Sequence, residues 1–321
     1  MSFASDVRGE LARQAVTDAC CVRSELTAAL LCGGGIAWRG RGRYAASVTA
    51  GEAATVRRYF AMLKQFYGLI GQIRTISGDA LNNQTRYQLA VADEDAAKLL
   101  DALGLLDEGG LFGLRAVPPE ETVRFASCRK AFVRAAFLMC GAVSHPERAY
   151  HFEITVTTED LADFIAAQLA YFGINVKKTC RKGKYVVYLK RAEEISDALS
   201  LLRASGSMLA FENVRVKKEV SNRVNRQLNC DNSNINRAVT AAEALIRDIH
   251  YIDGELGLEK LPAPLREMAF ARANNPEMPL AELGELLDPP LGKSGVSARL
   301  RRLADIADKL RSGEEITFRK A

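Results

Sequence analysis

The sequence predicts an α+β N-terminal domain of two αββαββα repeats with pseudo-two-fold symmetry, followed by an all-α C-terminal domain. Two observations lead to this fold class: an internal repeat in the first two thirds of the 321-residue chain, and amphipathic helical stretches separated by prolines after it. The length is about twice the usual domain size of ~150 residues. We expect an N-terminal domain over residues 1–204, a linker over 205–229, a helical domain over 230–315 and a tail over 316–321.

Each repeat begins with a helical segment rich in small residues. An offset of 107 residues places ELTAALLCGGGI over FVRAAFLMCGAV, so that Cys21 meets Cys128 and Gly34 meets Gly141. The paired alanines of both segments leave small side chains on faces that would otherwise hold large ones. Small side chains let helix axes approach at the low end of the ~8–10 Å packing range. We therefore expect these two helices to pack against each other at the symmetry axis.

The rest of each repeat alternates strands and helices. In the second repeat, period-two alternation over 151–156 predicts a strand and helical spacing over 159–170 predicts a helix. Two more strands, 174–180 and 185–190, flank the turn Arg181-Lys182-Gly183, and a helix follows over 192–203. The first repeat has the corresponding strand at 44–50, helix at 52–67, strands at 69–77 and 86–91, and helix at 96–105.

The composition excludes several classes of protein. Hydrophobic residues make up 48% of the chain and charged residues 26%, which is typical of a folded globular protein rather than a disordered one. The longest apolar stretches, 26–38 and 135–144, fall short of the ~20 residues of a membrane span, and no export signal is recognisable. Seven cysteines at irregular spacings indicate reduced, mostly buried thiols. We expect a cytoplasmic protein that does not contact a membrane.

The sequence contains no recognisable catalytic or metal-binding motif. The three histidines do not pair with a cysteine or an acid at a metal-ligand spacing, and Cys20-Cys21 is too close for CxxC geometry. Gly33-Gly34-Gly35 matches neither the GxxxxGK[ST] nor the GxGxxG phosphate-binding pattern, and a helix that ends before a strand explains it. We therefore expect no enzyme activity, no cofactor and no metal site.

Basic residues cluster at two predicted hairpins. Arg39, Arg41 and Arg43 lie at the junction of the first hairpin, and no acid occurs between residues 175 and 191 around the second. Such residues either form a solvated turn or neutralise DNA phosphates, where counterion release favours binding. The cluster at the second hairpin consists of Lys177, Lys178, Arg181, Lys182 and Lys184.

A boundary between domains is predicted after the second repeat. Ser205-Gly206-Ser207 interrupts the preceding helix, and residues 208–220 show no clear period. Residues 222–236 contain six asparagines, a composition typical of turns and helix caps. A contact with DNA or a protein partner through Arg223, Arg226 and Arg237 is the alternative interpretation.

The C-terminal segment predicts four helices. An amphipathic helix starts near Ile235, a second covers 265–273, and a third covers 280–287 with Pro279 suited to its first turn. Asp288-Pro289-Pro290 ends the third helix, because proline lacks the needed N–H group and disfavours helix before it. The last helix covers 292–311.

The last two helices have the pattern of a helix-turn-helix. In the final helix, Val296, Leu300 and Leu303 fall on one stripe, and polar residues lie roughly opposite. The N-terminal part of such a helix enters the major groove of DNA. A solvated basic face on a structural helix is the alternative. We assign Ser294, Ser297 and Arg301 to base edges, and Lys293, Arg299 and Arg302 to phosphates.

Two resemblances add to this interpretation. TAALLCGGG and AAFLMCGAV resemble degenerate copies of the motif of LAGLIDADG homing endonucleases, whose saddle-shaped sheet straddles DNA. SFASDVRGELAR, NCDNSNINR and KSGVSARLRRL resemble the WhiA family of bacterial sporulation-type transcription regulators, over roughly residues 2 to 312. The resemblance implies a LAGLIDADG-like domain followed by a helix-turn-helix. Gly292 replaces the serine expected at the start of the last helix, which weakens its N-cap.

The resemblance also implies that nuclease activity has been lost. In active homing endonucleases each motif ends with an acid, and the two acids hold a divalent metal ion for phosphodiester hydrolysis. Gly34 and Gly141 occupy those positions here, and glycine has no side chain with which to bind Mg²⁺. An active endonuclease is therefore disfavoured.

Together these observations predict a sequence-specific, double-stranded DNA-binding transcription regulator of the sporulation or cell-division type. The nuclease-like domain would add electrostatic grip on DNA or a docking surface for RNA polymerase or another regulator. The main alternative is a nucleoid-associated, cell-division or chromosome-segregation factor whose DNA binding is not primarily transcriptional. We expect the protein at the nucleoid in the cytoplasm, and the sequence is compatible with a monomer.

Overall fold

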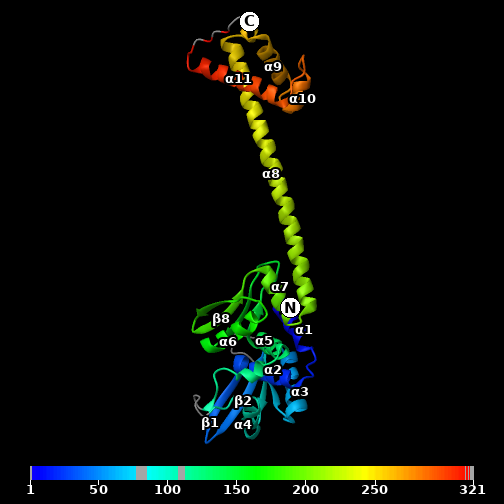
Figure 1. Cartoon of the computed structure of the whole chain (residues 1–321), viewed down its shortest axis with the longest axis vertical. Coiled ribbons are helices and arrows are strands. Elements are labelled where there is room, and N and C mark those ends of the chain that lie inside the picture. The colour runs from blue at the N-terminus through cyan, green and yellow to red at the C-terminus, as the bar shows by residue number, and fades with distance from the viewer. Residues whose placement is uncertain (1, 77–84, 108–112, 315, 317, 319–321) are drawn as a thin grey trace. The chain divides into compact units, whose positions relative to one another are not determined.

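The computed structural model describes residues 2–76, 85–107, 113–314, 316 and 318. The chain divides into two compact units, Met1–Glu219 and Val220–Ala321 (Figure 1). We describe each unit by itself.

The first repeat of the N-terminal unit follows a short helix, α1 (Phe3–Ala12). Its strands form one antiparallel sheet in the order β1-β2-β4-β3, so the two hairpins of the repeat lie side by side. The elements of the repeat are α2 (Ala19–Gly33), β1 (Gly34–Gly40), β2 (Arg43–Ala50), α3 (Ala53–Tyr67), β3 (Gln72–Ile76), β4 (Arg86–Val91) and α4 (Asp93–Ala102).

The second repeat has the same element order. Its sheet order, β5-β6-β8-β7, corresponds strand for strand to that of the first. The predicted αββαββα repeats are therefore confirmed, and only element ends differ; the strand expected over 174–180 covers Lys177–Arg181. After a 3₁₀ turn at Glu120–Val123 come α5 (Ala126–Cys140), β5 (Gly141–Val143), β6 (Phe152–Val156), α6 (Glu159–Ala170), β7 (Lys177–Arg181), β8 (Lys184–Leu189) and α7 (Ala192–Leu201).

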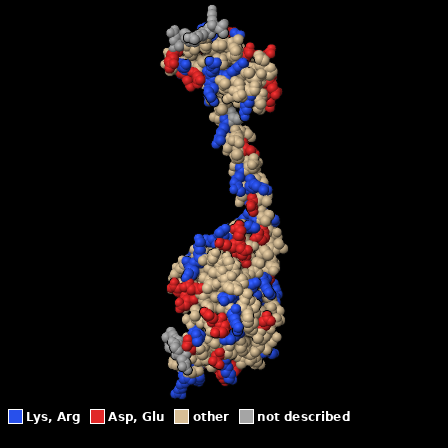
Figure 2. Space-filling model, in the orientation of Figure 1, with Lys and Arg blue, Asp and Glu red and all other residues tan. Residues whose placement is uncertain are grey.

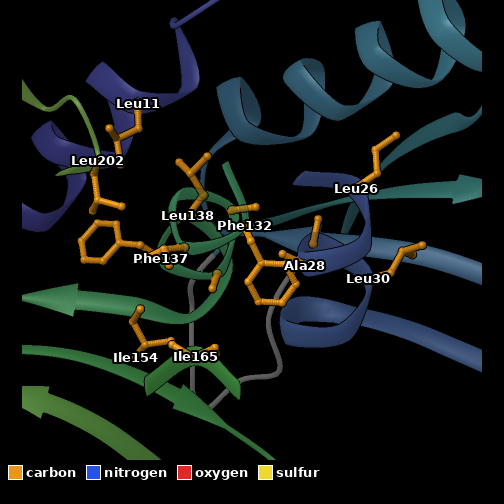
Figure 3. Close-up of a cluster of buried hydrophobic side chains, with 14 of the residues drawn as sticks. Leu11, Leu26, Ala28, Leu30, Phe132, Phe137, Leu138, Ile154, Ile165 and Leu202 are labelled. Carbon is orange, nitrogen blue, oxygen red and sulfur yellow. The ribbon is translucent and has the colours of Figure 1, made fainter. Parts of the chain in front are cut away.

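Helices α2 and α5 lie in the centre of the unit, and their side chains share one apolar core (Figure 3). Ala28 and Ala135 are completely buried. Gly33 marks a close approach between the helices, because a Cβ atom added there would lie 2.5 Å from Cε of Met139. The sequence-based expectation that small residues bring these two helices together is therefore confirmed.

A buried cluster of charges also joins the two repeats. The Glu25 carboxylate on α2 accepts hydrogen bonds from Arg58 on α3 and from Arg134 on α5, at 2.9 Å each. Glu25 is completely buried, and both arginines are nearly so. Burial lowers the pKa of Arg134, but a guanidinium group remains charged in a protein. Because Glu25 pairs with both arginines in a buried site, the three side chains hold α2, α3 and α5 in one arrangement.

Helix α1 contacts both repeats and also the first turn of the helix that follows the second repeat. Its buried side chains, Phe3, Val7 and Leu11, pack in the apolar core of the N-terminal unit. Arg8 forms an ion pair with Glu52 at 2.8 Å and donates a hydrogen bond to the carbonyl of Gly141 at 2.9 Å. Glu10 accepts hydrogen bonds from the backbone N–H groups of Gly206 and Ser207, at 2.8 and 2.9 Å. Glu10 therefore acts as a side-chain cap for the first turn of α8 (Ser205–Glu255).

The sequence-based prediction of an irregular linker over residues 205–229 is wrong. Residues 205–229 are helical and form the first part of α8 (Ser205–Glu255), and Ser205-Gly206-Ser207 is its first turn rather than a break. The boundary between the two units falls after Glu219, within this helix. The asparagines of 222–236 are exposed residues inside the helix, not caps or turns. The cost of asparagine in a helix is only a few tenths of a kcal/mol per residue, and the flanking helical sequence outweighs it.

The C-terminal unit is helical, as the sequence predicts. Besides the end of α8 it contains a 3₁₀ turn (Leu258–Lys260), α9 (Ala263–Asn274), α10 (Leu280–Glu285) and α11 (Lys293–Arg311). Its separate apolar core includes Ile249 and Ile252 from α8, Met268 from α9, Leu283 from α10 and Leu303 from α11.

Candidate nucleic-acid interface

Helix α11 presents one apolar and one polar side. The stripe predicted from the sequence is confirmed: Val296 and Leu303 are completely buried, and Leu300 is 3% exposed. On the other side of the helix, at its N-terminal end, Lys293 and Ser294 are exposed. Arg301 and Arg302 are exposed about two turns further along. The N-terminal half of α11 therefore carries four exposed polar side chains above a packed base.

Two of the six α11 residues that the sequence assigned to DNA contacts also face other parts of the C-terminal unit. Ser297 is only partly exposed, and together with Arg301 it lines a cavity of about 920 Å³ between α11, the second part of α8 and the segment before α10. Arg299 is half-buried, and its Nη1 donates a hydrogen bond to the carbonyl of Pro264 at 3.3 Å. Arg299 thus contacts the start of α9, which argues against a purely phosphate-binding role for this residue.

The turn before α11 depends on one glycine. A Cβ atom on Gly284 of α10 would lie 2.0 Å from the carbonyl oxygen of Leu291, and the N–H of Leu291 donates to the carbonyl of Gly284 at 2.9 Å. The chain can therefore return closely over α10 before α11 begins. The Nη1 of buried Arg272 stabilises the preceding connection by donating to three carbonyls, those of Asn275, Pro276 and Met278. Burial lowers the pKa of Arg272.

The second sheet separates the basic residues of its hairpin onto two faces. Directly paired residues of antiparallel strands lie on the same face of a sheet. Lys178 pairs with buried Val187, so it lies on the helix-covered face, and it forms an ion pair with Asp163 of α6. Lys177 pairs with Tyr188, and Arg181 pairs with Lys184, on the opposite face. We call this opposite face the open face; Lys182 lies in the turn at its end.

The first hairpin places its three arginines at an exposed tip. Arg39 and Arg43 lie at the ends of β1 and β2, and Arg41 lies in the turn with φ of 53° between two glycines that also have positive φ. All three side chains are exposed. Figure 2 shows basic side chains, with acidic ones beside them, at this end of the N-terminal unit. The sequence-based cluster is therefore also a cluster in space.

Sequence reasoning missed further polar residues on the first sheet. They lie on the face opposite its buried face, which we also call the open face. Gln72 pairs with Ala90, Arg74 with Gln88 and Ile76 with Arg86. Because Gln88 also pairs with Thr49, these residues lie opposite the buried face of Val48 and Leu89. No acid occurs on the open face in the described strands of this sheet. Period-two alternation over 86–91 was the signal that could have identified Arg86.

The positions that end the two LAGLIDADG-like motifs lie at helix ends. Gly34 follows α2 and Gly141 follows α5, and each also begins a strand. A Cβ atom on Gly34 would lie 2.3 Å from the carbonyl oxygen of Leu30, and one on Gly141 would lie 2.6 Å from that of Phe137. A carboxylate side chain would therefore require both helix ends to move.

Comparison with known proteins covers both units. Three family models match: the WhiA N-terminal LAGLIDADG-like domain over residues 19–106, the WhiA LAGLIDADG-like domain over 129–221 and the WhiA C-terminal HTH domain over 224–307.

Within the described part of the chain, no helix combines the length and hydropathy of a membrane span.

Relatives and a solved structure match over nearly the whole chain. A probable cell division protein WhiA from Desulforamulus reducens is 37% identical and covers 98% of both chains. One from Clostridium botulinum is 35% identical and covers 98% of this chain and 100% of its own. The crystal structure of full-length DUF199/WhiA from Thermatoga maritima matches with a TM-score of 0.59 at 22% identity, covering 96% of this chain and 99% of that one. The chain, with a degenerate LAGLIDADG-like domain and a C-terminal helix-turn-helix domain, belongs to the WhiA family.

Proposed function

We propose that this chain is a sequence-specific DNA-binding transcription regulator whose helix α11 enters the major groove of double-stranded DNA. The observation that carries the proposal is the free polar side of the N-terminal half of α11, above a fully packed apolar side. The turn at Gly284 supports it, because it gives α10 and α11 the close packing of a helix-turn-helix.

Within α11 the exposed residues have different proposed roles. Ser294 and Arg301 contact base edges, because serine hydroxyls and arginine guanidinium groups make directional hydrogen bonds there. Lys293 and Arg302 contact phosphates, which carry little sequence information. Ser297 is only partly exposed and lines the cavity, so its contact with a base edge is secondary, and Arg299 serves mainly to position α11 against α9.

The proposed experiment is selection of bound sequences from random DNA with the full-length chain. Arg301→Ala should weaken binding by about 1–3 kcal/mol and relax the preference at one base pair, whereas Lys293→Ala should weaken binding to all sequences alike. Equal, sequence-independent losses in both variants would contradict the assignment. Asp305→Asn, at another exposed position of α11, serves as a control for nonspecific charge effects.

The N-terminal unit has a supporting role in this proposal. Its open faces carry basic and amide side chains that hold DNA phosphates, including Lys177, Arg181 and Lys184 on the second sheet. Docking of RNA polymerase or another regulator on the same faces is the alternative role. Crosslinking of full-length protein to labelled DNA through residues of either sheet distinguishes the two.

We also propose that this chain does not cleave DNA. Gly34 and Gly141 occupy the positions that the metal-binding acids take in active LAGLIDADG nucleases. Incubation of the pure protein with duplex DNA and Mg²⁺ or Mn²⁺ tests this proposal. Cleavage that disappears when a nearby acid is replaced would overturn it.

A second candidate function has one observation in its favour, since the relatives bear the name probable cell division protein WhiA. In this alternative, DNA binding serves cell division or chromosome segregation at the nucleoid rather than transcription. Genome-wide occupancy measured together with promoter output separates the two candidates. Binding at promoters whose output changes when Arg301 is replaced supports the regulator, whereas occupancy without such changes supports the alternative.

A further inference from the structure

The N-terminal ends of α2 and α5 bring three thiols together. Cys20 and Cys21 lie in the first turn of α2 and Cys128 lies in the first turn of α5, and their three Sγ atoms all lie within 4.8 Å of one another. Among the described residues, no other set of three cysteine, histidine or acidic ligand atoms converges in this way. Cys21 and Cys128 occupy corresponding positions of the two repeats, so the packing of α2 on α5 brings them together.

Two cysteines of this thiol cluster are buried, and the third is exposed to solvent. Cys21 and Cys128 are 5% and 1% exposed and pack with Ala131 and Val16. Cys20 is exposed, so an ion has access from solvent. All three cysteines are free thiols.

The electrostatic setting favours thiolates once their protons are displaced. The N-cap residues of the two helices, Asp18 and Phe125, make no side-chain hydrogen bond to the first turn. Two helix N-termini therefore direct uncapped N–H groups and the positive end of the helix dipole toward this region. Burial raises the pKa of Cys128, which favours the protonated thiol in the absence of a metal ion. Metal binding to cysteine displaces such protons.

We propose that Cys20, Cys21 and Cys128 form a three-thiolate site for one thiophilic metal ion, of the class of Cu⁺ or Zn²⁺. Soft sulfur ligands select these ions over Mg²⁺ or Ca²⁺. Three sulfurs at about 2.3 Å from one ion lie about 4 Å apart, and the observed Sγ atoms already lie within 4.8 Å of one another. Cu⁺ would be held by the three sulfurs alone, whereas Zn²⁺ would add water as a fourth ligand.

The site would link the two repeats, because two ligands come from the first and one from the second. A bound ion stabilises the folded state of the unit that it links. The N-terminal unit should therefore unfold at higher temperature with metal bound, while the unfolding of the C-terminal unit stays unchanged. This effect does not depend on DNA binding.

The test uses reduced, metal-free, full-length protein with Cd²⁺ as a spectroscopic probe, followed by competition with Zn²⁺ and with Cu⁺. We expect one Cd²⁺ per chain and an ultraviolet sulfur-to-cadmium charge-transfer band with the intensity of three thiolates. Removal of a residue that only hydrogen-bonds a metal ligand weakens metal binding about 10–100-fold, so Cys128→Ser, which removes a ligand, should weaken it more than about 100-fold.

Two matched controls use the remaining cysteines. Cys32 and Cys140 lie near each other at the other end of the same helices, and Cys180 and Cys230 are exposed. The double variants Cys32→Ser/Cys140→Ser and Cys180→Ser/Cys230→Ser should keep the Cd²⁺ band. Loss of the band in the first control, or its retention in Cys128→Ser, would overturn the proposal.

A second measurement needs no variant. Cd²⁺ should protect Cys20, Cys21 and Cys128 of the wild-type protein from alkylation in mild denaturant, as mapped by mass spectrometry, while Cys180 and Cys230 stay reactive. Protection of other cysteines instead, or a Cys21–Cys128 disulfide formed in air together with no metal uptake by the reduced protein, would also overturn it.

Discussion

The two repeats of the N-terminal unit share one topology but differ at corresponding positions. Where the first repeat has the buried carboxylate of Glu25, the second has Phe132, whose ring lies 5.1 Å from that of Phe164. At this position the first repeat therefore contributes a buried charge that pairs with Arg134 of the second repeat, whereas the second repeat makes an aromatic contact within itself. The same backbone arrangement tolerates either a buried charge or a buried aromatic ring at this position. A buried charge needs ion-pair and hydrogen-bond partners, whereas an aromatic ring needs only apolar contacts.

The open faces of the two sheets differ in a similar way. The first sheet carries Arg43, Arg74 and Arg86 without an acid on its described strands. The second carries basic residues together with Glu153, which lies 2.9 Å from Nε2 of His151. If both faces hold DNA, the first should therefore contribute the larger electrostatic share.

The largest effect is expected for Glu25→Gln. The change leaves two arginines buried without their counter-charge, and breaking a buried ion pair in this way costs about 3–5 kcal/mol. Urea unfolding of the full-length protein measures the destabilisation of the N-terminal unit. Glu94→Gln, at an exposed position of α4, is the control and should cost less than about 1 kcal/mol.

A companion variant sharpens this prediction. Replacing Glu25, Arg58 and Arg134 together with apolar residues of similar volume should recover most of the missing stability, because such replacements are often neutral or stabilising. If Glu25→Gln alone proves neutral, the buried charges do not hold the two repeats together.

The second effect concerns the open faces. We expect Arg43→Gln/Arg74→Gln/Arg86→Gln and Lys177→Gln/Arg181→Gln/Lys184→Gln each to reduce the slope of log affinity against log salt, by about 0.9 for every DNA phosphate that the variant no longer neutralises. The first set should have the larger effect, since no acid offsets its charges. Fluorescence anisotropy on one duplex over a series of salt concentrations measures both slopes. Unchanged slopes in both variants would favour the docking role over the DNA role.

Periodicity predicted the elements that have a regular buried stripe. Helix α6 covers Glu159–Ala170, as expected, because one apolar face runs its whole length. Helix α8 was missed over 205–229 because its first turn is capped by Glu10, almost 200 residues earlier in the chain. A local sequence window contains no information on such a partner.

The candidate site shows the same limit. The exposure of four of the six assigned α11 residues followed from helical periodicity, whereas the position of Arg74 on the open face depends on strand register and so could not be read locally. Lys178 was grouped with Lys177 by proximity in sequence, although adjacent residues of a strand point to opposite faces. The thiol cluster was within reach, because the repeat had already aligned Cys21 with Cys128 and predicted that their helices pack together.

A smaller effect is expected for the cap of α8. Burial alone would raise the pKa of Glu10, but hydrogen bonds from Ser207 and Gly206 outweigh it, so the pKa lies below its ordinary value of 4.5. A lowered folded-state pKa means that the stabilisation is present above pH 4.5 and disappears as the pH falls through the folded-state value. Glu10→Gln should cost about 0.5–2 kcal/mol at neutral pH.

Unfolding of wild-type and Glu10→Gln protein between pH 7 and pH 3 tests this prediction. The difference between them should shrink on acidification, since protonation removes the same charge that the variant lacks. Asp101→Asn, at an exposed position near the end of α4, is the control. A difference that stays constant over this range would show that the carboxylate charge does not contribute to the cap.

The smallest effect separates two neighbouring lysines. Lys178 forms an ion pair with Asp163 on the helix-covered face, whereas Lys177 lies on the open face. We expect Lys178→Gln to leave the salt dependence of DNA binding unchanged and to cost about 0.2–1 kcal/mol of stability, the usual value of an exposed pair. Lys177→Gln should do the reverse, lowering the salt slope by about 0.9 with little change in stability. If both lysines change the slope equally, the division of the hairpin by strand register does not govern DNA contact, and the charge of the whole hairpin acts as one.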